Sequence, residues 1–159
     1  MKYLFVCLIL AVCASTACAA LRVGSPAPDI LLNDLKGAQM SVPDEVRGKV
    51  AIIHFWQTGC SSCKEDMPAM DRLYREYQRK GLTIIAVNVG QSREVVREAV
   101  SGLGISYPVL VDTGRSSASG YDITGVPRTI IIDRTGIVRF KIIGPAPHAM
   151  LKKYLQSLL

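Results

Sequence analysis

The period of the hydrophobic positions changes several times along this chain. Residues 50–56 and 82–89 are short, almost continuous apolar runs, which is typical of strands buried on both faces of a sheet. Between them, residues 61–80 carry an apolar stripe at three- and four-residue spacing, and Gly81 follows, so we expect a helix that ends there. The stripe consists of Met67, Met70, Leu73 (or Tyr74) and Tyr77. A strand, a helix and a strand in this order predict a βαβ unit.

Shorter patterns complete the expected fold. They predict a hairpin of residues 30–32 and 40–42, a helix over 93–103, a strand over 108–111, a hairpin of 129–133 and 137–143, and a last helix over 148–159. Strands that alternate with helices and then close with a hairpin and a helix indicate an α/β fold. We expect a mixed central sheet with helices on both faces and an N-terminal β-hairpin extension.

A separate pattern occupies residues 1–19. Lys2 is followed by an unbroken apolar run over residues 3–12 and then by small residues, as in a secretory signal peptide. The run is shorter than the roughly 20 apolar residues of a membrane-spanning helix. We therefore expect export, with residues 1–19 removed and residues 20–159 forming one domain. Two alternatives are an uncleaved anchor and a lipoprotein leader that ends before a lipidated Cys18, and either would tether the domain to the membrane.

The charge pattern argues against one class of partner. Lys and Arg number 19 against 13 Asp and Glu, but the two signs alternate along the chain instead of forming blocks. The mild excess of positive charge is therefore best explained as a solvated surface, and we expect no nucleic-acid partner. With about 140 residues after residue 19, the chain can bury one core. Separately, we expect a monomer.

The cysteines supply the candidate chemistry. Three of the five lie within residues 1–19, which leaves Cys60 and Cys63 for the folded domain. They follow a predicted strand and begin a predicted helix, so their Cα atoms should be close enough for a disulfide. The partial positive charge of the helix N-terminus should lower the pKa of Cys60 and make it the exposed nucleophile. Cys63, one turn deeper, should then attack the mixed disulfide and release the product.

Other uses of this cysteine pair are weaker interpretations. A structural zinc site needs four ligands, and there is no second C-x-x-C pair or nearby pair of histidines. A c-type haem site would need histidine where Lys64 stands. A passive structural disulfide is an alternative, although so small a loop would contribute little stability. We expect no metal and no cofactor other than a redox-active disulfide between Cys60 and Cys63.

The motif around the cysteines resembles the thioredoxin superfamily. W-x-x-x-C-x-x-C-K follows a strand, Pro68 lies five residues beyond the second cysteine, and Gly-Val-Pro stands at residues 125–127. Within that superfamily, the chain closely resembles the TlpA/ResA-type extracytoplasmic thiol–disulfide oxidoreductases, which are often linked to cytochrome c maturation. The shared segments are residues 23–29, 54–56, 63–68, 85–89, 107–109, 125–127 and 131–133. They cover essentially the whole chain after residue 19 in order.

The resemblance implies roles for several residues. Pro127 matches the cis-proline of the superfamily, which places the backbone of Val126 beside the disulfide to pair with an extended substrate. Trp56 matches a tryptophan that packs against the active-site loop, although by itself it could simply be a core aromatic residue. Asp66 stands where many relatives have glutamate and could accept a proton from Cys63. Alternatively, Asp66 is an acid that the helix dipole favours.

The resemblance also implies a direction and partners. Such proteins usually reduce disulfides in exported proteins, such as apocytochrome c in the periplasm, with electrons from a membrane thiol carrier. Two departures leave the redox potential and the substrate open. Ser61 and Ser62 separate the cysteines where relatives commonly have proline second, and Gly59 replaces a common tryptophan.

Two further residues, His54 and Arg128, each have two possible roles, and two other functions of the chain must be compared with thiol–disulfide exchange. His54, on the strand face of Trp56, could transfer protons or could be an ordinary core residue, and Arg128 could bind an acidic substrate or merely be exposed. A peroxiredoxin-like peroxidase would need Pro-x-x-x-Thr-x-x-Cys, whereas Thr58 is only two residues before Cys60. A copper-binding assembly chaperone would suit two thiolates, but such proteins typically use C-x-x-x-C and a distant histidine.

Overall fold

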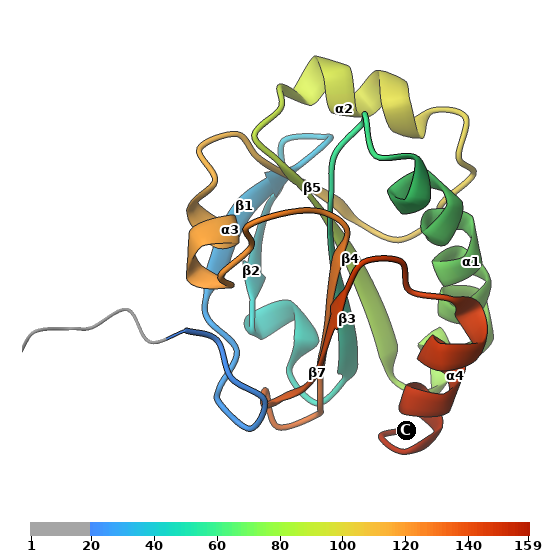
Figure 1. Ribbon diagram of the computed structural model, residues 1–159. Helices are drawn as coiled ribbons and strands as arrows, with labels where there is room; N and C mark the ends of the chain where they lie inside the picture. The colour runs from blue at the N-terminus through green and yellow to red at the C-terminus, as the bar shows by residue number, and fades with distance from the viewer. Residues whose placement is uncertain (1–19) are drawn as a thin grey trace, which may run out of the picture.

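A seven-stranded sheet forms the centre of the molecule, as the computed structural model shows (Figure 1). The strands are β1 (Ile30–Asp34), β2 (Gln39–Val42), β3 (Val50–Trp56), β4 (Leu82–Val89), β5 (Val109–Asp112), β6 (Arg128–Ile132) and β7 (Val138–Ile143). The helices are α1 (Ser61–Tyr77), α2 (Arg93–Val100), α3 (Ser116–Gly120) and α4 (His148–Gln156), with 3-10 turns η1 (Asp44–Val46) and η2 (Gln78–Lys80). The structure describes residues 20–159, so the predicted signal peptide or lipoprotein leader lies outside the described residues.

The sheet is mixed, as the sequence predicts. Its strand order is β2-β1-β5-β4-β3-β6-β7. β3, β4 and β5 are parallel because the helices α1 and α2 carry the chain back across the sheet between them. β6 pairs with β3 in the antiparallel sense, and β7 and the hairpin of β1 and β2 complete the two edges. This order brings the start of β6 beside the end of β3.

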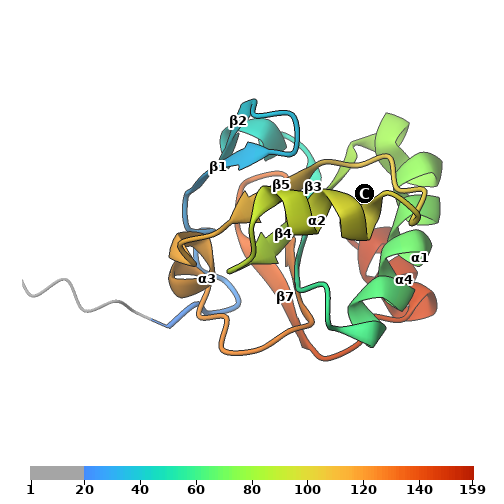
Figure 2. The same ribbon diagram turned by 90° about the horizontal axis from the view of Figure 1, so that it is seen from above.

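Helices cover both faces of the sheet, and each face has its own apolar core. On one face, the stripe of α1 is buried together with Leu151 and Leu155 of α4 and with Val96 of α2. On the other face, Ala118 of α3 packs with Phe55 of β3 and with further apolar side chains of the sheet. Figure 2 shows α1 and α4 together on one side and α3 on the other. The α/β fold expected from the sequence is therefore confirmed.

All four helices differ from the sequence prediction. α1, α2 and α4 end at Tyr77, Val100 and Gln156, each three residues earlier than expected, although the 3-10 turn η2 continues α1 to Lys80. α3 was not predicted, because five residues are too few to show a helical period. A single carboxylate holds it: Asp112 accepts hydrogen bonds from the N–H of Ser116, the hydroxyl of Ser117 and the N–H of Ala118. Within residues 20–159, no helix is long and apolar enough to cross a bilayer.

Candidate active site

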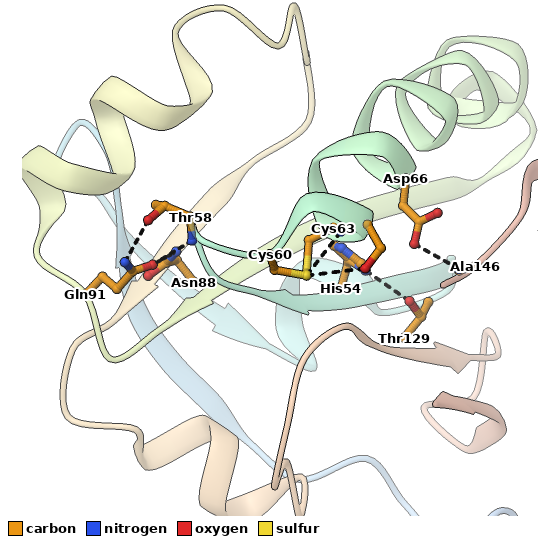
Figure 3. The surroundings of a disulfide bond; sticks show 10 residues. His54, Thr58, Cys60, Cys63, Asp66, Asn88, Gln91, Thr129 and Ala146 are labelled. Carbon is orange, nitrogen blue, oxygen red and sulfur yellow. Dashed lines mark hydrogen bonds between the residues drawn. A yellow bond between two sulfur atoms is a disulfide. The ribbon is translucent and has the colours of Figure 1, made fainter. Parts of the chain in front are cut away.

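The loop between β3 and α1 carries a disulfide bond (Figure 3). Cys60 and Cys63 have their Cα atoms 5.3 Å apart and their sulfur atoms 2.08 Å apart, so the predicted pairing is confirmed. Cys60 is the N-cap residue of α1 and is only partly buried, whereas Cys63 is fully buried in the first turn. Cys60 is therefore the sulfur that another protein could reach first. Within the described residues, no three His, Cys, Asp or Glu side chains gather as metal ligands do.

The sulfur of Cys60 lies among hydrogen-bond donors at the start of α1. The backbone N–H of Cys63 donates to Cys60 Sγ at 3.2 Å. The hydroxyl Oγ of Ser62 is 3.6 Å from the same sulfur. The first N–H groups of a helix have no partner within the helix and carry partial positive charge. This environment favours a negative charge on Cys60, as the nucleophile of thiol–disulfide exchange requires.

The loop before Cys60 is attached to the end of β4 by side-chain amides (Figure 3). Gln91 accepts from the backbone N–H of Thr58 at 2.8 Å and donates to its hydroxyl at 2.8 Å. Asn88 donates to the same oxygen of Gln91 at 3.0 Å, and Gln57 donates to the carbonyl oxygen of Val89 at 2.9 Å. The hydrophobic pattern of the chain did not predict this network. A polar asparagine inside the apolar run 82–89 is the signal that could have revealed it.

Asp66 lies on α1, three residues beyond Cys63, and only 8% of it is exposed. Its Oδ2 accepts a hydrogen bond from the N–H of Ala146 at 2.8 Å (Figure 3). Burial raises the pKa of Asp66 above its ordinary value because the charged form loses its hydration. The hydrogen bond from Ala146 opposes this shift and the nearby charge of Glu65 adds to it, with a raised pKa as the net result. The carboxyl group can therefore hold a proton more readily than an exposed aspartate.

His54 is fully buried in β3 and contacts the neighbouring strand β6. Its Nδ1 is 3.0 Å from the hydroxyl of Thr129 in β6, the residue directly opposite in the sheet. Its Nε2 has no hydrogen-bond partner among residues 20–159. Burial lowers the pKa of His54 to about 4, so the imidazole is neutral at neutral pH. This favours the interpretation of His54 as a core residue over proton transfer near neutral pH.

The peptide bond between Val126 and Pro127 is cis, as the resemblance implied. Pro127 is buried and leads directly into β6, whose first residue, Arg128, lies opposite Phe55. The cis bond is therefore at the end of the sheet where β3 leaves for Cys60. Val126 packs against the core cluster that contains Trp56 and Cys63.

The remaining predicted residues have simpler surroundings. Trp56 is fully buried, and its indole Nε1 has no hydrogen-bond partner within the described part of the chain. Arg128 is partly exposed and donates to the hydroxyl of Thr124 at 3.2 Å. The structure thus brings together Cys60, Cys63, Trp56 and the cis-proline loop.

Comparison with known proteins agrees with this geometry. Residues 23–141 match the AhpC/TSA family. The chain is 36% identical over 139 residues to the thiol-disulfide oxidoreductase ResA of Geobacillus thermodenitrificans. The aligned residues are 87% of this chain and 79% of that protein. It is 33% identical over 132 residues to ResA of Bacillus subtilis, which covers 83% of this chain and 73% of that protein.

Solved structures agree as well. A thiol:disulfide interchange protein of the thioredoxin family from Chlorobium tepidum TLS has a TM-score of 0.76 and 28% identity, over 88% of this chain and 99% of that one. The thioredoxin domain of a thiol-disulfide oxidoreductase from Bacteroides vulgatus has a TM-score of 0.78 and 25% identity. The match covers 88% of this chain and 100% of that one. Because the family and the ResA proteins match it over most of its length, this chain belongs to the thioredoxin-like AhpC/TSA family and is a ResA-type thiol–disulfide oxidoreductase.

Proposed function

We propose that this enzyme works outside the cytoplasm and reduces disulfide bonds in exported proteins, with apocytochrome c as the substrate. The observation that carries the proposal is the unequal exposure of the two cysteines at the start of α1. A reachable Cys60 beside helix N–H groups suits the attack on a foreign disulfide. A buried Cys63 suits the internal step that follows.

The reaction consists of two successive thiol–disulfide exchange steps, which together transfer two electrons from the enzyme to the substrate. The Cys60 thiolate attacks one sulfur of the substrate disulfide; that S–S bond breaks, a mixed disulfide forms, and one substrate thiolate leaves. The Cys63 thiolate then attacks Cys60 Sγ and releases the second substrate thiolate. The substrate gains two electrons and takes up two protons, and the enzyme is left with its own disulfide. A dithiol carrier in the membrane returns the two electrons, and no cofactor besides the cysteine pair is needed.

Three other residues have supporting roles in this proposal. The backbone of Val126, beside the buried cis-proline Pro127, pairs with the extended substrate chain. Trp56 supports the site from the core below it. Asp66, whose pKa is raised by burial, accepts the proton of Cys63 before the second exchange.

The proposed location and partner come from the sequence and the relatives. The signal-peptide pattern of residues 1–19 favours export, with Cys18 as a candidate lipid tether. The ResA relatives support a disulfide-bonded protein substrate. We propose further that the enzyme acts in the maturation of cytochrome c and that it is a monomer.

The test is the reduction potential of the Cys60–Cys63 couple, measured in the purified protein by equilibration with thiol buffers and mapping of the two cysteines. A reductase should have a potential near that of thioredoxin, roughly −270 mV. The Cys63→Ser variant is the control, because it cannot form the couple and should show no such equilibrium.

A potential near that of DsbA, roughly −120 mV, would overturn the proposed direction. Such a value marks a protein that donates its disulfide. The enzyme would then oxidise its protein substrates.

A further inference from the structure

The hydroxyl group of Ser62 lies beside the reacting sulfur of the site. Ser62 is the second residue between the two cysteines, and its Oγ is 3.6 Å from Cys60 Sγ. In the disulfide form this sulfur carries no hydrogen, so the hydroxyl must be the donor. Within residues 20–159, the Ser62 side chain has no other hydrogen-bond partner. Its orientation is therefore not explained by another contact.

Two donors of different origin converge on Cys60 Sγ. The N–H of Cys63, at 3.2 Å, belongs to the backbone, so almost any residue at that position would supply it. The hydroxyl of Ser62 belongs to a side chain and is specific to this sequence. A proline in its place, common among the proteins that the motif resembles, would offer no donor.

The hydroxyl should matter most when the disulfide is reduced. Reduction leaves Cys60 at the N-terminus of α1, where the helix dipole and the N–H of Cys63 favour the thiolate. Hydrogen bonds to a charged acceptor are roughly twice as strong as neutral ones. A contact that is weak at a disulfide sulfur thus becomes a charge-assisted hydrogen bond at a thiolate.

We propose that Ser62 is a further catalytic residue of this enzyme, whose hydroxyl donates a hydrogen bond to the Cys60 thiolate. The inference rests on the proposed function in one respect, that Cys60 is the attacking sulfur. The hydrogen bond increases the fraction of Cys60 that is ionised and ready to attack. It also stabilises the reduced enzyme, which moves the equilibrium with a thiol buffer toward the dithiol.

Ser61 provides a matched control for the test. It is the first residue of α1, adjacent to Ser62, but its side chain is exposed. Among the described residues, its hydroxyl makes no hydrogen bond to either cysteine sulfur. Ser61→Ala therefore removes a hydroxyl from the same helical turn without removing the contact with Cys60. Ser62→Thr keeps a hydroxyl at the critical position.

The measurement is the pH dependence of the alkylation of Cys60 by iodoacetamide in the purified, fully reduced protein, with peptide mapping to separate it from the other cysteines. Ser62→Ala should lower the acid dissociation constant of Cys60 about tenfold, equivalent to about 1.4 kcal/mol. Ser61→Ala and Ser62→Thr should leave it near the parent value. The reduction potential of Ser62→Ala should become more negative, by at most about 30 mV for that tenfold change.

Two results would overturn the assignment while leaving the proposed function intact. One is an unchanged Cys60 dissociation constant in Ser62→Ala. The other is an equal change in Ser61→Ala, which would indicate a general effect at the helix end. If the reagent labelled Cys63 before Cys60, the proposed order of attack would fail, and the role of Ser62 would fail with it.

Discussion

At the scale of single residues, the surroundings of Asp66 bear on two interpretations that the sequence left open. An acid that merely stabilises the start of a helix should be ionised and exposed to solvent. Asp66 is instead buried, and burial raises its pKa. The N–H of Ala146 holds one oxygen, so the side chain has a fixed orientation. A fixed carboxyl group with a raised pKa is better suited to accept a proton than to stabilise the helix.

Replacing Asp66 by asparagine should slow the second exchange without disrupting the fold. The amide oxygen can still accept the hydrogen bond from Ala146, but the side chain can no longer take a proton from Cys63. We expect the release of substrate from the mixed disulfide to slow about 100-fold at neutral pH, the lower range for loss of a general base. Rapid-mixing measurements on a preformed mixed disulfide over a range of pH would show this.

The conservative variant Asp66→Glu is the control for this effect. It keeps a carboxyl group on α1 and should recover most of the rate. An Asp66→Asn enzyme with the parent rate and pH profile would leave Asp66 with a structural role only.

At the scale of elements, the hydrophobic pattern of the sequence predicted the βαβ unit of β3, α1 and β4 well. β3, α1 and β4 each have a strong hydrophobic period, and the residues of the predicted stripe on α1 are all buried. α3 could not be found in this way, because it depends on hydrogen bonds to Asp112 rather than on a period. Thr58 and Gln91 are 33 residues apart, and they meet only because β3 and β4 lie side by side. A contact of that kind depends on strand register, which a linear pattern does not contain.

The amide of Gln91 should fix the loop that presents Cys60. It makes three hydrogen bonds, two with Thr58 and one with Asn88. Gln91→Ala should leave the N–H of Thr58 without its partner and loosen the loop, because partly buried donors are costly to leave unpaired. We expect the free energy of unfolding to fall by about 1–3 kcal/mol and the first exchange to slow. Urea unfolding of the oxidised protein and reduction of a model disulfide measure the two effects.

Gln78→Ala is the matched control, since Gln78 is exposed and lies at the far end of α1. It should change neither quantity. If Gln91→Ala behaved like Gln78→Ala in both measurements, the loop would hold its geometry without the amide network.

At the scale of the whole molecule, the site is assembled from distant parts of the chain by the strand order. The cysteine loop follows β3, whereas the cis-proline loop precedes β6. The sequence indicated both motifs through the spacing of Cys60, Cys63 and Pro127, and the family resemblance implied that they meet. The link between Asp66 and Ala146, however, spans 80 residues and carries no local signal. Burial and pairing of this kind are properties of the folded molecule alone.

His54 gives the whole protein a pH-dependent stability. Its pKa falls from an ordinary value of 6.5 to about 4 because burial disfavours the charged imidazolium. Between these two values the unfolded chain binds a proton that the folded chain does not. The contribution of neutral His54 is therefore complete above pH 6.5 and decreases as the pH falls toward about 4, by about 3 kcal/mol in total.

Urea unfolding of the oxidised protein at a series of pH values checks this expectation. His54→Asn should be less stable than the parent near neutral pH because of the smaller side chain. Its free energy of unfolding should nevertheless fall less steeply between pH 6.5 and about 4, because asparagine does not titrate. His148→Asn, which removes the other histidine of the chain at the start of α4, is the control for the loss of a histidine. A parent slope in His54→Asn would mean that the buried imidazole is not the group that couples the stability of this fold to acid.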